Sequence, residues 1–348
     1  MTLPQSDDPQ AVQPAADPFA EDRMEQSNSD DPQGAADAVA ATTESTPPES
    51  SQTDPSTFAP VPEEPPLFAN VFQPEPPPPP ARIPHLGHVA LLAVYLALSL
   101  FASIVVVGAA VHFRLFNATS LQSAMNDIHY ALGSEFLIYL GAFIAAYFTF
   151  PLIWHKRFFA GLQWNWATAL RHRWALIGTG FFCYLLAIVN IIFVPGPSNT
   201  PIEKIFKQPG AAWLLFFFGI TIAPFFEELI FRGFLLPSLC TAYDWLAEKF
   251  YKVPRRPLRS DGSPQWSFSA MAIASLVTSA LFALMHAEQT GNSVDAVLLL
   301  ACVSIVLCAV RLITRSLAAS VLVHALYNFL IFSMMLVGTQ GFQHLDKM

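Results

Sequence analysis

The chain has 348 residues, of which 53% are hydrophobic and 13% charged, and its mean hydropathy is +0.42. Soluble domains carry roughly 25% charged residues, so this composition excludes an ordinary soluble protein. The formal net charge of −8 gives no indication of nucleic-acid binding. Long apolar runs recur, each near the roughly 20 residues needed to cross about 30 Å of hydrocarbon. We therefore predict an integral, multi-pass membrane protein surrounded by membrane lipid.

Residues 1–84 differ in composition from the rest of the chain. They hold 15 acidic side chains, two basic ones and 19 of the 29 prolines, including the run PEPPPPP at 74–80. Such a segment cannot bury enough apolar surface to offset the entropy lost on ordering it. We predict a disordered, acidic, proline-rich tail over residues 1–84, ahead of the first membrane segment.

Hydropathy predicts seven membrane-spanning helices, so the predicted fold is an all-α transmembrane bundle. The expected ranges are 88–112, 132–154, 174–195, 211–239, 268–286, 294–311 and 317–338. These runs are continuously apolar and lack the alternating pattern of a membrane β-barrel. The fourth range is overlong and contains Pro224, a residue that kinks or breaks helices. A split there, which would give eight helices, stays open.

Basic residues gather in every second loop, at 155–174, 240–267 and 311–316. Loops with an excess of Lys and Arg stay in the cytosol. We therefore expect a cytoplasmic N-terminal tail and a location in the cell membrane.

Three charged residues lie close together within the fourth apolar range, in the stretch PFFEELIFRGF at 224–234. A charge at bilayer depth costs at least about 2.5–3.5 kcal/mol, so such a cluster indicates a functional site. The alternative is a structural ion pair, because Glu228 and Arg232 are four residues apart and share a helix face. Glu227 is then left over as an unpaired carboxylate, which suits a general base.

Two further polar pairs occur in apolar ranges. Phe282 and His286 in LFALMH are four residues apart, as are His324 and Asn328 in VLVHALYNFL. Buried polar groups need partners, so we expect these three helices to converge on one hydrated cavity. Such a set can activate water and stabilise an oxyanion, as amide hydrolysis requires. The ranges place the two histidines at different depths, so convergence requires a helix that is tilted, broken or longer than predicted.

The chain contains the three motifs EELIFR, FALMH and HALYN in this order. In these motifs and their order it resembles the CAAX protease and bacteriocin-processing (Abi) family, over roughly residues 205–335. This family includes type II CAAX prenyl endopeptidases and lysostaphin-resistance-like proteins. The resemblance implies an intramembrane endopeptidase. It also implies water activation by Glu227 with His286, an oxyanion hole of His324 and Asn328, and support from Glu228 and Arg232.

The resemblance also implies a catalytic core at 201–338, after N-terminal membrane helices at 85–200 and before a short C-terminal tail at 339–348. The expected partner is a peptide or protein substrate, prenylated in the eukaryotic relatives, which enters through a cavity open to the cytosol. No cofactor is expected, and a metalloprotease with zinc on the same glutamate and histidines is the alternative. A non-catalytic membrane immunity or scaffold protein stays open. So does a proton-coupled transporter, although the chain has no inverted repeat.

Overall fold

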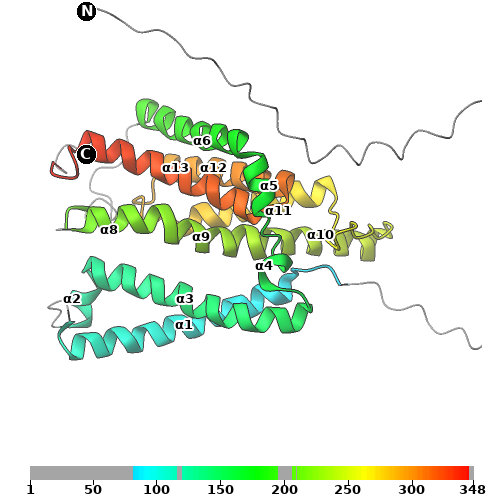
Figure 1. Ribbon diagram of the computed structural model, residues 1–348, viewed down its shortest axis with the longest axis horizontal. Helices are drawn as coiled ribbons and strands as arrows, with labels where there is room; N and C mark the ends of the chain where they lie inside the picture. The colour runs from blue at the N-terminus through cyan, green and yellow to red at the C-terminus, as the bar shows by residue number, and fades with distance from the viewer. Residues whose placement is uncertain (1–80, 116–119, 195–205, 209, 345–348) are drawn as a thin grey trace, which may run out of the picture. The chain divides into compact units, whose positions relative to one another are not determined.

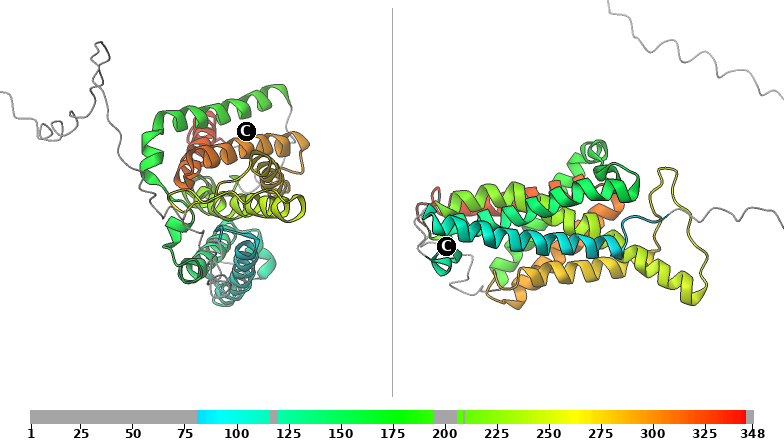
Figure 2. Two further views of the ribbon diagram at one scale, coloured as in Figure 1. Left: turned by 90° about the vertical axis from the view of Figure 1, so that its right-hand side faces the viewer. Right: turned by 90° about the horizontal axis from the view of Figure 1, so that it is seen from below.

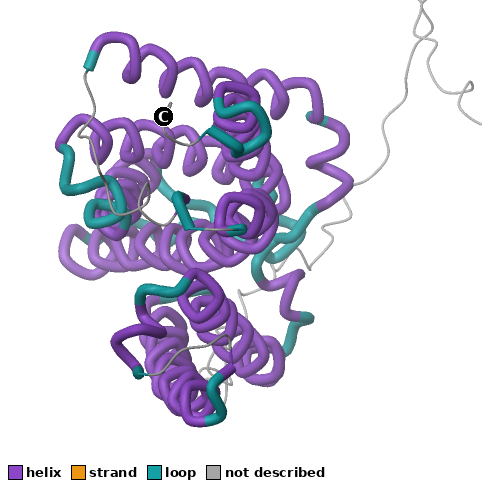
Figure 3. The backbone as a smooth tube through the Cα atoms, turned by 90° about the vertical axis from the view of Figure 1, so that its left-hand side faces the viewer, coloured by secondary structure: helices purple, strands orange, loops and turns teal. Residues whose placement is uncertain are grey.

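The structure of the protein is a computed structural model that describes residues 81–115, 120–194, 206–208 and 210–344. These residues belong to one compact unit of the chain. The predicted acidic tail lies outside the described residues except for residues 81–84. Within the described part the regular secondary structure is helical and no strand occurs (Figure 3). The predicted all-α class is confirmed.

Seven helices in the described part of the chain are long and apolar enough to cross a membrane, as predicted. They are α1 (Leu86–His112), α3 (Ile128–Trp154), α6 (Arg173–Phe193), one helix of 41 residues (Ala211–Tyr251), α11 (Phe268–Met285), α12 (Val294–Thr314) and α13 (Leu317–Gly338). The short helices α2 (Leu121–Met125), α4 (Phe158–Gly161) and α5 (Trp166–Arg171) lie in the connections. Figure 1 shows the long helices side by side, with roughly parallel axes.

Helices α1 and α3 pack against each other and form one side of this unit (Figure 2, left). Small polar residues allow the two backbones to approach, and Ser103 Oγ lies 2.8 Å from Ser134 Oγ. The pair packs on the 41-residue helix through aromatic side chains, with the rings of Phe150 and Phe234 4.9 Å apart. The pair thereby holds α3 against the helix that carries the charged cluster.

The 41-residue helix is continuous and changes its hydrogen-bond register twice. It consists of α8 (Ala211–Phe217), the π-helical segment η3 (Phe218–Ile222), α9 (Ala223–Glu228), the π-helical segment η4 (Leu229–Leu235) and α10 (Leu236–Tyr251). Pro224 lies inside it without breaking it. A split into two helices at Pro224 is therefore wrong, and the described residues contain seven membrane-length helices rather than eight.

The register change at η3 explains how the helix accommodates Pro224. The N–H of Ala223 bonds to the carbonyl of Phe218, five residues earlier. In the same register the carbonyl of Gly219 would pair with residue 224, but proline has no N–H. The side chain of Asn328 in α13 supplies the missing donor, since its Nδ2 lies 2.7 Å from the Gly219 carbonyl oxygen.

The same arrangement recurs at η4. The N–H of Leu236 bonds to the carbonyl of Phe231, so the carbonyl of Arg232 would pair with Pro237. Here Nε of Arg311 in α12 donates to the Arg232 carbonyl at 3.1 Å. Two side chains from neighbouring helices therefore satisfy the carbonyls that the prolines leave open. They also tie the long helix to α12 and α13.

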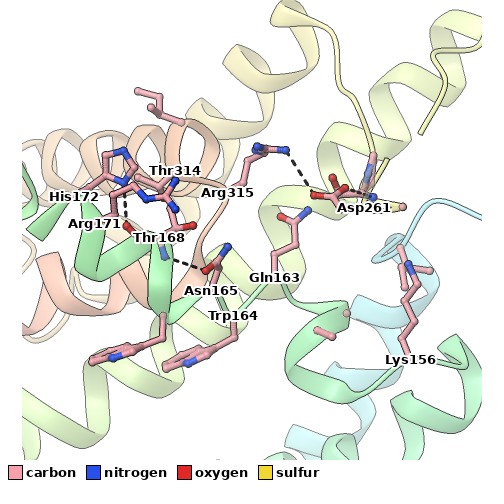
Figure 4. Close-up of a pocket in the computed structure, with 18 residues that line it drawn as sticks. Lys156, Gln163, Trp164, Asn165, Thr168, Arg171, His172, Asp261, Thr314 and Arg315 are labelled. Atoms are coloured by element: carbon pink, nitrogen blue, oxygen red, sulfur yellow. Dashed lines mark hydrogen bonds and ion pairs between the residues drawn. The ribbon is translucent and has the colours of Figure 1, made fainter. Parts of the chain in front are cut away.

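The loops predicted to be basic lie together at one end of the unit, which we call the basic end. Arg82, ahead of α1, pairs with Glu248 in α10 at 2.7 Å, and Arg315 in the α12–α13 turn lies 3.7 Å from Asp261 in the α10–α11 loop. A cavity of about 500 Å³ at this end is lined by Lys156 together with Asp261 and Arg315 (Figure 4). The side of the membrane that this end faces stays a prediction.

Helix α11 is shifted along its axis toward the basic end, which removes the predicted mismatch in depth. Its N-cap residue Ser267 donates to Asp244 of α10 at 2.6 Å. Arg232 is level with the last turns of α12, because Arg311 of α12 bonds to its carbonyl. Asp244 lies about 18 Å further along the same helix. His286 is about 27 Å from the start of α11 and His324 about 10 Å from the start of α13. The two histidines therefore meet because α10 and the first part of α11 project past α13 (Figure 2, right).

Candidate active site

A cavity of about 280 Å³ lies between α3, the 41-residue helix, α11, α12 and α13. Four of the six predicted site residues line this cavity, and the other two are fully buried beside it. The four are Glu227 of α9, His286 at the C-cap of α11, and His324 and Asn328 of α13; the two are Glu228 and Arg232. The structure thus brings together all six side chains from the three predicted segments.

Glu227 lies between the two imidazole rings. Its Oε1 is 3.8 Å from Nε2 of His286, and its Oε2 is 3.8 Å from Nε2 of His324. Both distances exceed that of a direct hydrogen bond, so neither Nε2 is engaged by the carboxylate. The Glu227 side chain is 10% exposed, which leaves its oxygens accessible to the cavity. One carboxylate and two imidazole nitrogens therefore face the same space.

The Nδ1 atom of each imidazole is held by a different kind of partner. Nδ1 of His286 lies 2.8 Å from the carbonyl oxygen of Phe282, one turn earlier in α11. Nδ1 of His324 lies 2.9 Å from Oε1 of Glu228. Both partners accept hydrogen bonds, so Nδ1 of each ring carries a proton and Nε2 points toward Glu227. The partner of His286 is an uncharged carbonyl, whereas the partner of His324 is a carboxylate, which suits an imidazolium.

Glu228 and Arg232 form the ion pair that their spacing predicts. Arg232 Nη1 lies 2.7 Å from Glu228 Oε1, and both side chains are fully buried. The Nη2 atom of Arg232 donates to Ser304 of α12, at 2.6 Å to Oγ and 3.1 Å to the carbonyl oxygen. The guanidinium also lies over the ring of Phe282, 4.8 Å from its centroid. These contacts hold the Glu228 carboxylate in place beside His324. Glu228 is therefore part of a buried ion pair, whereas Glu227 faces the cavity.

Asn328 has a structural contact that the sequence did not indicate. One N–H of its amide is directed at the carbonyl of Gly219. A side-chain amide carries two N–H groups, so the second stays available to a ligand in the cavity. The contact orients the amide at the cavity wall.

Two residues of this region are absent from the three motifs. Ser304 holds Arg232, but a serine in an apolar helix has no pattern that marks it as a partner. Glu135 of α3 also lines the cavity. Its signal was present in the sequence, because an acidic residue in a predicted membrane segment is a functional hypothesis by default.

The zinc alternative requires the glutamate and the two histidines to act as ligands of one ion. Within the residues that the structure describes, no group of three or more His, Cys, Asp or Glu side chains is arranged to hold a metal ion.

Comparison with protein families identifies the region that carries these residues. Residues 209–330 match the model of the family described as type II CAAX prenyl endopeptidase Rce1-like, and this range contains all six predicted site residues. No curated protein and no solved structure matches the chain. With its seven membrane-length apolar helices, the chain is an integral multi-pass membrane protein that carries a domain of CAAX-type intramembrane proteases. Residues 209–330 therefore carry a domain of the CAAX protease family.

Proposed function

We propose that the chain is a glutamate-type intramembrane endopeptidase that hydrolyses a peptide bond with water activated by Glu227 and His286. One observation carries this proposal: the Glu227 carboxylate faces two imidazole Nε2 atoms inside the cavity. Glu228, the neighbouring carboxylate, is already engaged by Arg232 and His324. Only Glu227 of the pair is therefore free to act on a water molecule.

In the proposed reaction, water between Glu227 and His286 loses a proton to this pair and attacks the carbonyl carbon of the substrate. The tetrahedral oxyanion accepts hydrogen bonds from His324 and Asn328. For this role His324 is an imidazolium, with Nδ1 donating to Glu228 and Nε2 donating to the oxyanion. With Glu227 and Glu228 negative and His324 and Arg232 positive, the four groups carry no net charge, as a membrane interior favours.

The test is proteolysis of a peptide library by the purified protein. We expect cleavage by the wild type, none by Glu227→Gln or His286→Ala, and reduced cleavage by Glu228→Ala. A Glu288→Gln variant is the matched control, since Glu288 is an exposed carboxylate just beyond the end of α11. Full cleavage by Glu227→Gln would remove the catalytic assignment. Absence of cleavage by the wild type would favour the non-catalytic immunity or scaffold alternative.

Metal analysis of the same sample tests the metalloprotease alternative. In the proposed reaction the carboxylate and the imidazoles act on water directly, so no step takes place on a metal. We expect activity to persist after chelation and dialysis. Stoichiometric zinc that is lost together with activity, and restores activity when added back, would overturn the glutamate-type proposal.

The substrate is proposed to enter from the membrane face opposite the basic end. The cavity is lined by Ile128 at the start of α3, Leu215 in the second turn of the 41-residue helix and Gln289 in the α11–α12 loop, all toward that opposite end. If the basic loops are cytosolic, this entry lies on the non-cytosolic side of the membrane. The proposed entry is therefore compatible with cytosolic basic loops or with entry from the cytosol, but not with both.

A reporter fused after α13 tests this orientation, because α13 ends opposite the basic end. We expect alkaline phosphatase fused there to be active, since it needs a non-cytosolic location, and green fluorescent protein fused there to be dark. The reverse result would place the cavity on the cytosolic side. It would then favour a cytosolic substrate such as a prenylated chain terminus.

A further inference from the structure

The cavity contains a carboxyl group that the family-matched region does not supply. Glu135 lies in the second turn of α3, outside residues 209–330, and lines the same cavity as Glu227 and His286. Ionisable residues inside membrane segments are rare and usually functional. The position of Glu135 in α3 therefore indicates a functional role.

Several contacts hold the turn of α3 that carries Glu135. Tyr139, one turn later on the same face of α3, lies next to the Glu135 carboxyl group. The ring of Tyr139 stacks on Phe226 at 5.0 Å with an interplanar angle of 21°, and Phe226 directly precedes Glu227. On the other side of the same turn, Ser134 is bonded to α1. These contacts join the turn that carries Glu135 both to α1 and to the residue before Glu227.

Glu135 also interacts electrostatically with two residues of the proposed reaction. Glu135, Glu227 and His286 all line the same cavity, so their charges act on one another. A proton can therefore pass among the three groups through the cavity. Water activation and oxyanion binding use Glu227, His286, His324 and Asn328, and they leave one requirement of amide hydrolysis unassigned. The departing amine is a poor leaving group unless its nitrogen receives a proton.

We propose that Glu135 is the general acid that protonates the departing nitrogen, and this proposal rests on the peptidase function proposed above. The carbon–nitrogen bond breaks, its electron pair goes to nitrogen, and nitrogen takes the proton of the neutral Glu135 carboxyl group. Glu135 is left as a carboxylate beside Tyr139. The proton that water gave to Glu227 and His286 then passes to Glu135, so the cycle closes without another reactant.

The experiment compares an amide and a thioester at the same scissile position of one peptide identified by library cleavage. A thiolate has a pKa of about 8.5 and departs without a proton, whereas an amine does not. For Glu135→Gln we expect a loss of kcat on the amide on the order of 10²–10⁴-fold, and thioester cleavage near that of the wild type. Glu227→Gln should fail on both substrates, because each needs activated water, and Glu288→Gln should leave both unchanged.

Equal losses on amide and thioester would assign Glu135 a structural role and overturn the proposal. Unchanged amide cleavage by Glu135→Gln would overturn it as well, while the peptidase function would stand. If the wild type cleaves neither substrate, the peptidase function itself fails and Glu135 has no such role. Should Glu135→Gln not fold, Tyr139→Phe replaces it. That variant removes the hydroxyl group next to the Glu135 carboxylate and should slow cleavage of the amide more than that of the thioester. Equal effects would contradict the proposal.

Discussion

Arg311 offers a direct test of how the long helix accommodates its prolines. The side chain is 2% exposed and donates to two backbone carbonyls, Nε to Arg232 at 3.1 Å and Nη2 to Leu162 at 3.2 Å. A hydrogen bond from a charged donor contributes about 1.5–3 kcal/mol. Arg311→Met removes both bonds, so we expect a loss of about 3–6 kcal/mol in the free energy of unfolding.

The sharper prediction concerns the coupling of Arg311 to Pro237. Pro237→Ala supplies the N–H that the Arg232 carbonyl lacks in the π register, so it should rescue part of the Arg311→Met loss. An unpaired buried carbonyl costs about 1–3 kcal/mol, and this is the expected coupling energy. Any gain in helix propensity from the alanine appears in both backgrounds and cancels in a double-mutant cycle.

Reversible unfolding in mixed micelles of detergent and sodium dodecyl sulfate, followed by circular dichroism, measures the four free energies of this cycle. Pro224→Ala in the Arg311→Met background is the matched control, because the carbonyl opposite Pro224 is served by Asn328. We expect no coupling there. Additive effects of Arg311→Met and Pro237→Ala, or equal coupling with Pro224→Ala, would refute the explanation of the π segments.

Three other predictions concern the site and the tail. Glu228→Gln leaves the Arg232 guanidinium buried without its counter-charge and should lower the free energy of unfolding by about 3–5 kcal/mol. The double variant with Arg232→Met should be more stable than Glu228→Gln alone, and the same unfolding assay measures both. Asn328→Ala should lower kcat by about 10²–10³-fold with little change in KM, whereas a raised KM at constant kcat would indicate ground-state binding. Deletion of residues 1–80 should leave turnover of a short peptide unchanged, and a large loss would show that the tail is more than a tether.

The parts of the fold that sequence predicted are those set by local composition. Continuous apolar runs fixed the existence of the seven spans, and the spacing of Glu228 and Arg232 predicted their ion pair. The register of the fourth helix was not predictable in this way. Whether Pro224 breaks a helix depends on a donor that is more than 100 residues away, here the amide of Asn328.

The depth of the two histidines shows the same limit. Hydropathy does not show how far one helix is displaced along the membrane normal relative to another. Helix α11 is displaced because Ser267 bonds to Asp244 in a part of α10 that projects past α13. Likewise, the motif spacing places His324 next to Asn328 but does not predict its contact with Glu228. That 2.9 Å contact arises from the packing of α13 on the long helix. Glu135 was missed for a different reason, because it belongs to no motif.

The π segment η3 also gives this protein a way to alter its cavity without changing its catalytic residues. A π segment contains one residue more than the α-helix that it replaces, and each residue turns a helix by about 100°. Deletion of one residue from η3 would therefore rotate α8 relative to Glu227 while α9 keeps its place against the histidines. Leu215, which lines the cavity, would turn away and another side chain would take its position. Among relatives, single-residue gaps in this helix are thus expected to mark changes in which peptides fit.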